Sequence, residues 1–237
     1  MFIFGSPIFW LLALPGLVLG LFAQARVKGA FYNYSKVQTQ RNVTGAQVAR
    51  ALLDAQGLYD VKIERTKGML SDHYDPRGKV LRLSEAVHDQ VSVAAAGVAA
   101  HEMGHALQDA TGYAPLNLRS ALVPAASFGS SLAPMIFMAG LLLDMFTGNS
   151  GLGYYIAWLG VILFGAAVFF TLVTLPVEFD ASKRAKQLLV SNGILFQDEM
   201  TGVNKVLDAA ALTYVAAAVA AIGQLLYYVA ILAGRRD

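Results

Sequence analysis

Two histidines four residues apart, with a glutamate directly after the first, form the pattern in this sequence with the clearest capacity for chemistry. They are His101, Glu102 and His105, within AAHEMGHALQDA at residues 99–110. In a helix, residues i and i+4 lie on one face about 5–6 Å apart, so both imidazoles can point at one metal ion. The glutamate can then reach a water molecule on that ion, as in a catalytic zinc site. Gly104 lowers helix propensity, so helix formation alone does not explain the segment.

The sequence is too apolar for an ordinary water-soluble domain. Hydrophobic residues make up 56% and charged residues 14% of its 237 residues, whereas about a quarter of a soluble domain is charged. Four uncharged runs, at residues 1–24, 120–143, 151–177 and 209–234, are each long enough to cross a bilayer as a helix. No Lys or Arg precedes the first run, which favours a retained anchor over a cleaved signal peptide. We therefore expect a multi-pass membrane protein with about four transmembrane helices.

Positive charge is concentrated in two polar blocks between these runs. Residues 26–119 hold twelve of the eighteen Lys and Arg, and residues 178–208 hold four more. The link between the second and third runs has none. The positive-inside rule therefore places both blocks in the cytoplasm and the link outside. Four full crossings would then place Arg235 and Arg236 outside, where the rule disfavours positive charge. The alternative to a full fourth crossing is a fourth run that is tilted or only partly inserted.

The third metal ligand is expected from the second polar block. A catalytic zinc ion usually has three protein ligands, but the chain has no cysteine, and Thr111 stands where an extended H-E-x-x-H-x-x-G-x-x-H pattern has its third histidine. Two antiparallel spans would bring Glu178, which directly follows the third run, to the membrane face where the histidines precede the second run. Glu178 is therefore the expected ligand. Asp180 either orients a histidine or pairs with Lys183 or Arg184.

The first polar block predicts a small mixture of helices and strands. Residues 44–58 indicate an amphipathic helix with Thr44 as its N-cap. Residues 58–68 and 73–84 indicate two strands, with a turn at residues 75–78. A helix from about Ser84 or His88 to Leu107 should carry the histidine pair. The segment 79–84 is either an edge strand that pairs with an extended substrate or an ordinary strand of a sheet.

Four segments of the chain together resemble a known family. They are SDHYDPRGKVLRLSE, GVAAHEMGHALQ, YAPLNLRSALVP and LPVEFDASKRA. They are similar to the YugP-like neutral zinc metallopeptidases of bacterial membranes. The layout is more distantly similar to the HtpX and CAAX-prenyl endopeptidase group of membrane gluzincins, where the glutamate of an E-x-x-A-D motif completes the zinc site. Glu178 matches that glutamate, whereas Ser182 stands where the aspartate would be, so Asp180 is a candidate substitute. The resemblance implies a zincin-like domain that hydrolyses peptides at a membrane.

The expected reaction is metal-assisted peptide hydrolysis with one Zn²⁺ ion. The two histidines and the remote glutamate would hold the ion, and Glu102 would be the general base. A further side chain should stabilise the oxyanion or bind substrate, and the candidates are His73, Tyr113 and Arg184. The alternative for His73 is an ordinary turn or surface histidine with no role in the site.

Two other functions fit parts of the pattern. An intramembrane protease of the site-2 type would also use H-E-x-x-H, but its third ligand would come from an Asp-Gly pair in a later span, and the sequence has no such pair. A non-catalytic, zinc-stabilised membrane scaffold would not need Glu102. Hydrolysis measured with and without this glutamate separates the enzyme from the scaffold.

The expected organisation is mainly α, with a small β-hairpin or sheet. It comprises an anchor (1–25), a cytoplasmic catalytic part (26–119), a transmembrane hairpin (120–177), a second cytoplasmic part with the third ligand (178–208) and a C-terminal hydrophobic helix (209–237). The expected location is the cell membrane, with the active site on its cytoplasmic side. The expected partners are a peptide or membrane-protein substrate and the lipid bilayer, with membrane-protein regulators or a second copy left open. A net charge of +2 gives no argument for nucleic acid.

Overall fold

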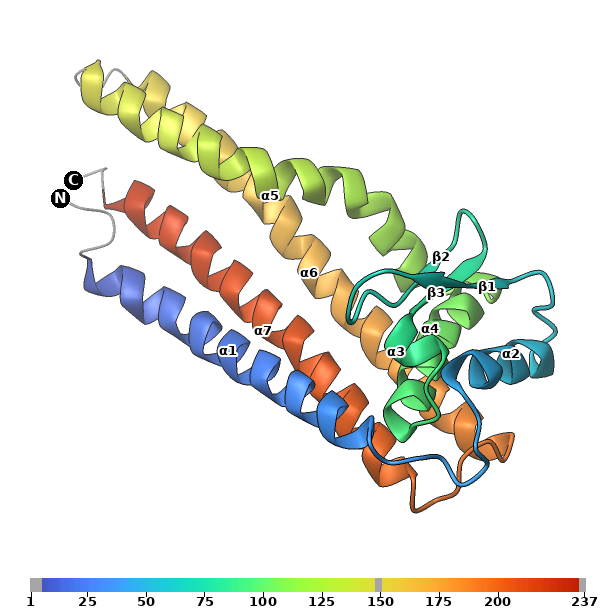
Figure 1. Cartoon of the computed structure of the whole chain (residues 1–237). Coiled ribbons are helices and arrows are strands. Elements are labelled where there is room, and N and C mark those ends of the chain that lie inside the picture. Colours follow the sequence, from blue (N-terminus) through green and yellow to red (C-terminus); the bar gives the residue numbers. More distant parts are fainter. Residues whose placement is uncertain (1–5, 148–150, 235–237) are drawn as a thin grey trace. The chain divides into compact units, whose positions relative to one another are not determined.

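The computed structural model describes residues 6–147 and 151–234, which are mainly helical with one small sheet (Figure 1). These residues form two compact units. Among these residues, the helical unit comprises 6–22, 118–147, 151–175 and 214–234, and the mixed unit comprises Ala23–Asn117 and Pro176–Thr213. The mainly α fold class with a small sheet is therefore confirmed.

Four helices are long and apolar enough to cross a membrane, as the sequence predicts. They are α1 (Pro7–Tyr34), α5 (Ala114–Phe146), α6 (Leu152–Ser191) and α7 (Met200–Ala233). Residues 209–233 of the fourth apolar run lie within the continuous helix α7. Residues 148–150 of the link between the second and third runs, and the two arginines at 235 and 236, lie outside the described residues. The expectations about their sides of the membrane stay predictions.

Close backbone contacts hold the helical unit together. A Cβ atom added to Gly140 of α5 would lie 2.4 Å from the backbone nitrogen of Ala157 in α6. One added to Gly16 of α1 would lie 2.5 Å from the Cα of Ala220 in α7. Small residues at such contacts let membrane helices approach closely. Large apolar side chains stay exposed on the outer surface, with Leu11 at 73% and Ile162 at 67%, and a lipid environment accommodates such a surface better than water.

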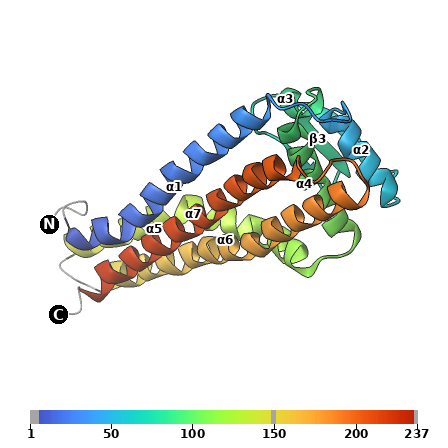
Figure 2. The same ribbon diagram turned by 90° about the horizontal axis from the view of Figure 1, so that it is seen from below.

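In the mixed unit, α2 (Gly45–Ala55) packs against α4 (Val93–Ala110), as Figures 1 and 2 both show. The N-terminus of α2 is a capping box. The Thr44 hydroxyl accepts a hydrogen bond from the backbone N–H of Gln47, and the Gln47 side chain accepts one from the backbone N–H of Thr44. The apolar face of α2 is fully buried, including Val48, Leu52 and Leu53. The amphipathic helix and its N-cap therefore lie where the sequence predicts them.

The sheet has three strands, one more than the sequence indicates. They are β1 (Lys62–Thr66), β2 (His73–Asp75) and β3 (Val80–Ser84), in the order β1-β3-β2. β3 is parallel to β1 and antiparallel to β2. β2 and β3 therefore form the hairpin around the expected turn. Because β3 is paired on both sides, the possibility that residues 79–84 form an edge strand for a substrate is wrong. Burial of both faces of β3 explains its apolar sequence.

The helix expected from Ser84 or His88 to Leu107 is interrupted in the structure. It consists of the short α3 (Glu85–His88) and, after a break, α4. Ser92 has an extended backbone, and its hydroxyl accepts a hydrogen bond from the backbone N–H of Ala95 at 3.1 Å. Ser92 is therefore the N-cap of α4, and this cap places the start of the helix after His88.

Candidate metal centre

α4 places His101 and His105 one helical turn apart on the same face. Their ring centroids are 4.8 Å apart and the rings are nearly perpendicular, with an interplanar angle of 88°. The histidine side chains keep only 13% and 10% of their surface exposed. The spacing of the two histidines thus gives the shared face that the sequence predicts.

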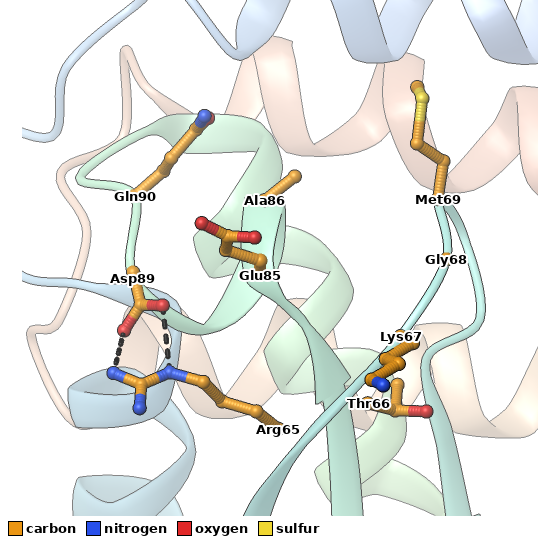
Figure 3. A pocket seen from close by; sticks show the side chains of 9 residues that line it. All are labelled: Arg65, Thr66, Lys67, Gly68, Met69, Glu85, Ala86, Asp89 and Gln90. Atoms are coloured by element: carbon orange, nitrogen blue, oxygen red, sulfur yellow. Dashed lines mark hydrogen bonds and ion pairs between the residues drawn. The ribbon is translucent and has the colours of Figure 1, made fainter.

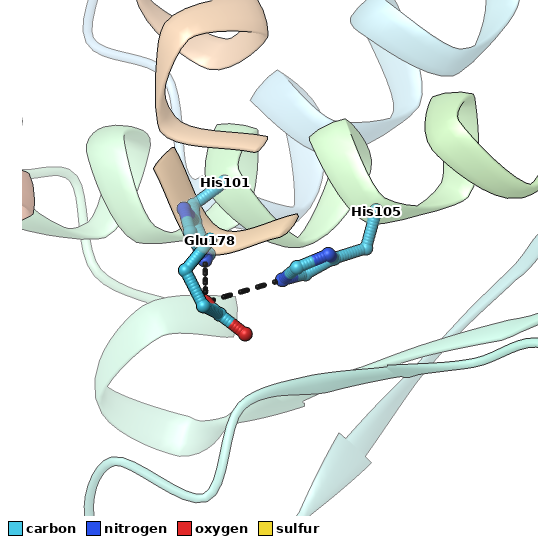
Figure 4. A group of neighbouring side chains, drawn as sticks. All are labelled: His101, His105 and Glu178. Carbon is cyan, nitrogen blue, oxygen red and sulfur yellow. Dashed lines mark hydrogen bonds and ion pairs between the residues drawn. The ribbon is translucent and has the colours of Figure 1, made fainter. Parts of the chain in front are cut away.

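α6 supplies the third side chain of the cluster, from 77 residues farther along the chain than His101. Glu178 Oε2 lies 3.2 Å from His101 Nε2 and 3.6 Å from His105 Nε2 (Figure 4). One ligand atom from each residue lies within 4.8 Å of the other two, and among the described residues this is the group of His, Asp and Glu that can hold a metal ion. The structure thus brings together the three residues predicted as ligands.

The donor set of this cluster fits a zinc ion. Two imidazole nitrogens and one carboxylate oxygen form a ligand combination that occurs at catalytic zinc sites and leaves a coordination position open. The Glu178 side chain is only 3% exposed, and burial of a carboxylate is costly unless a cation or hydrogen bonds compensate it. Donor chemistry and burial therefore both favour a bound cation here.

The negative charge around His105 also favours a bound cation at the cluster. Burial by itself would lower the pKa of His105, but the hydrogen bond with Glu178 and the negative charges of Glu102 and Glu178 outweigh burial and raise it. The same carboxylates that favour a proton on His105 also favour a metal ion in its place. Zinc binding should therefore release protons, because a metal ligand must be deprotonated.

Glu102, the predicted base, lies on α4 directly after His101. It is 8% exposed and buried among the residues of the mixed unit. Its negative charge acts on His105, which places its carboxylate in the electrostatic environment of the cluster. A buried carboxylate beside a metal site can take up a proton in a setting that largely excludes bulk water.

The histidine nitrogens that face away from Glu178 have their own polar partners. His101 Nδ1 lies 3.0 Å from the Ser182 hydroxyl, and His105 Nδ1 lies 3.0 Å from Gln108 Oε1. Such contacts orient metal-binding imidazoles and set which nitrogen carries the proton. The sequence alone predicts no role for Gln108 or Ser182. The available signals were the helical spacings, since Gln108 is three residues after His105 and Ser182 four after Glu178.

Gly104 allows the close approach of α4 and α6 at the cluster. A Cβ atom on Gly104 would lie 2.6 Å from the carbonyl oxygen of Ala181, three residues after Glu178. Any larger residue at 104 would force the two backbones apart. This contact is the packing reason for a glycine between the two histidines.

The remaining candidates occupy different places in the mixed unit. Asp180 accepts hydrogen bonds from Arg184 Nε at 2.5 Å and from Gln108 Nε2 at 2.9 Å. It therefore pairs with Arg184 and reaches His105 through Gln108. The Arg184 guanidinium also lies 5.5 Å from the ring centroid of Tyr113. His73 is exposed on β2, where its Nδ1 lies 2.8 Å from the Ser71 carbonyl oxygen.

A separate cavity of about 740 Å³ lies beside β1 and α3 (Figure 3). Its most prominent polar contact is the pair of hydrogen bonds from the Arg65 guanidinium to the Asp89 carboxylate, at 2.7 and 2.9 Å. Its lining includes none of the expected site residues. The cavity and the metal cluster are therefore made of different residues.

Comparison with known proteins gives an independent view of the chain. Residues 9–233 match the family described as "putative neutral zinc metallopeptidase". The chain is also 49% identical over 230 residues to the "putative membrane protease YugP" of Bacillus subtilis (strain 168). That similarity covers 97% of this chain and 99% of the relative. No solved structure shows a significant match.

Proposed function

The chain belongs to this family of zinc metallopeptidases, and from that premise we propose that it is a membrane-embedded zinc endopeptidase acting near the cytoplasmic face. The observation that carries the proposal is the convergence of His101, His105 and Glu178, whose ligand atoms lie within 4.8 Å of one another. Glu102, which follows His101 in the H-E-x-x-H pattern, supports catalysis, because a purely structural zinc site needs no such residue.

The proposed mechanism assigns a role to each residue of the cluster. His101, His105 and Glu178 would hold one zinc ion, and that ion would supply Lewis acidity and lower the pKa of the attacking water toward ~7. Glu102 accepts the proton of the attacking water and delivers it to the leaving amine. The burial of Glu102 and Glu178 limits competing contacts with bulk water. Arg184, Tyr113 and His73 stay candidates for binding substrate or stabilising the oxyanion.

The cytoplasmic location rests on charge and connectivity. The mixed unit holds fifteen of the eighteen Lys and Arg of the chain. Each candidate span has one end in this unit, so a single side of the bilayer satisfies the positive-inside rule for its basic residues. Residues 26–119 and 178–208 are accordingly the proposed catalytic parts. The proposed substrate is a peptide or a segment of a membrane protein.

The proposal is tested with purified full-length protein in detergent. Glu102→Gln keeps size and hydrogen bonding but loses basicity, so peptide hydrolysis should fall by at least ~10² while zinc stays bound. Glu64→Gln, at an exposed position of β1, is the matched control and should hydrolyse peptides as the parent does. Chelation should abolish hydrolysis, and added zinc should restore it.

Three results would contradict parts of this proposal. Undiminished hydrolysis by Glu102→Gln would remove Glu102 from the mechanism. Zinc bound by a parent protein that hydrolyses no peptide or membrane-protein fragment would favour the scaffold. Hydrolysis that persists without metal would exclude a zinc mechanism.

A further inference from the structure

A line of buried and partly buried polar contacts runs from the metal cluster into α6 through Gln108. The Gln108 side chain is completely buried. Its Oε1 lies 3.0 Å from His105 Nδ1, and its Nε2 donates to the Val177 carbonyl oxygen at 2.8 Å and to Asp180 Oδ2 at 2.9 Å. Asp180 Oδ2 in turn accepts a hydrogen bond from Arg184 Nε. Both N–H groups of the Gln108 amide therefore have partners, and its oxygen has one.

The chemistry of these partners fixes the orientation of the Gln108 amide. A carbonyl oxygen and a carboxylate oxygen only accept hydrogen bonds, so the NH₂ group must face Val177 and Asp180. The reversed amide would place its oxygen against the Val177 and Asp180 oxygens with no hydrogen between them, a costly arrangement for a buried group. The ion pair with Arg184 holds the Asp180 carboxylate in its accepting position. Gln108 Oε1 is therefore the end that faces His105.

This orientation decides which nitrogen of His105 is free to bind a metal. An amide oxygen can only accept, so His105 must carry a proton on Nδ1 to complete the contact. The lone pair of the neutral ring is then on Nε2, the nitrogen that lies 3.6 Å from Glu178 Oε2. Ser182 does not impose such a choice on His101, because a hydroxyl can either donate or accept.

We propose that Gln108 is a positioning residue for the metal centre: it selects the His105 tautomer with Nε2 free and links α4 to Val177 and Asp180, on either side of Glu178. Asp180 and Arg184 contribute by orienting Gln108. The inference rests on the proposed zinc site and adds to it a contact between the two helices that supply the ligands. Gln108 thus controls the direction of one ligand and the position of another.

The first test removes the hydrogen bonds of Gln108 while keeping the length of its side chain. Gln108→Met should weaken zinc binding by roughly 10–100-fold, the range typical for lost partners of metal-binding histidines. The affinity is measured on full-length protein by competition with a chromophoric chelator. The visible spectrum of the Co²⁺-substituted protein should also change, because it reports ligand geometry. Gln56→Met, at an exposed position after α2, is the matched control and should change neither readout.

The second test exchanges hydrogen-bonding polarity and does not depend on the methionine variant folding. Gln108→Glu keeps an acceptor for His105 but places a second carboxylate against Asp180, so zinc affinity should fall. Adding Asp180→Asn supplies an amide donor to the new carboxylate, so the double variant should bind zinc more tightly than Gln108→Glu alone. A merely structural role for Gln108 predicts no such recovery.

The outcomes separate this inference from the proposed function. Parental zinc affinity in Gln108→Met, or no recovery in the double variant, would overturn the positioning role. Where thermal unfolding shows that Gln108→Met is not folded, the comparison of the double variant with Gln108→Glu decides. Full zinc binding by His105→Ala would instead overturn the proposed metal site itself.

Discussion

Replacing Gly104 with alanine should disturb the metal centre through the packing of the two helices that form it. The added Cβ would lie 2.6 Å from the Ala181 carbonyl oxygen and 3.1 Å from its carbon. Both are backbone atoms, so no side-chain rotation can relieve the contact. Gly104→Ala should therefore move α4 away from α6, and His101 and His105 away from Glu178.

The size of this effect follows from the contact distance. A carbon–oxygen contact needs about 3.3 Å, so the backbones must separate by roughly 0.7 Å. Overpacking of this kind costs about 1–3 kcal/mol, and the higher helix propensity of alanine offsets about 1 kcal/mol of that. The free energy of unfolding should therefore fall by up to about 2 kcal/mol. Because metal–ligand distances tolerate only about ±0.2 Å, zinc affinity should fall by at least about tenfold.

Gly97 on the same helix provides the matched control. A Cβ atom there would lie 3.4 Å from Cγ1 of Val203, an ordinary contact with a side chain. Gly97→Ala should therefore keep zinc affinity and be slightly stabilised by its higher helix propensity. Denaturant unfolding and chelator competition on both purified variants make the comparison. Unchanged stability and zinc affinity in Gly104→Ala would refute the idea that this contact sets the ligand positions.

Three further predictions concern the third ligand, the fold and the topology. Glu178→Ala should lose both bound zinc and peptide hydrolysis. Asp180→Ala should weaken zinc binding by roughly 10–100-fold and regain activity when metal is added. If metal analysis finds full zinc in Glu178→Ala, the third ligand lies elsewhere. Thr44→Ala removes the α2 cap, so denaturant titrations should show a free energy of unfolding that is lower by about 1 kcal/mol, while zinc affinity stays unchanged. An unchanged free energy of unfolding would contradict the role of the cap. Asn149→Cys, outside the described residues, should react with an impermeant thiol reagent on intact cells, and Lys62→Cys should not. The reverse labelling would place the catalytic part outside.

The sequence predicts those parts of the site that follow from simple geometry. The shared face of His101 and His105 follows from helical periodicity, and the four long helices follow from the lengths of the apolar runs. Glu178 could be selected because two spans joined by a short link return the chain to the same membrane face. Each of these features depends on one helix or on one pair of helices.

Other features depend on contacts that one sequence does not reveal. Gln108 is a single polar residue on an Ala-rich helix, and its partners come from α6, so its role needed the packing of two helices. β2 has only three residues and carries too little alternation to be recognised. The central place of β3 depends on the strand order, which side-chain patterning does not specify. The break before α4 depends on Ser92, one of several possible caps in that segment.

The central claim is that His101, His105 and Glu178 together hold one zinc ion. Anomalous diffraction at the zinc edge, from crystals of the zinc-loaded full-length protein, tests it most directly. The expected result is one strong peak about 2.0–2.2 Å from the Nε2 atoms of both histidines and a carboxylate oxygen of Glu178. A zinc peak bound by other residues, or a fully loaded protein with no peak among these three side chains, would contradict the claim.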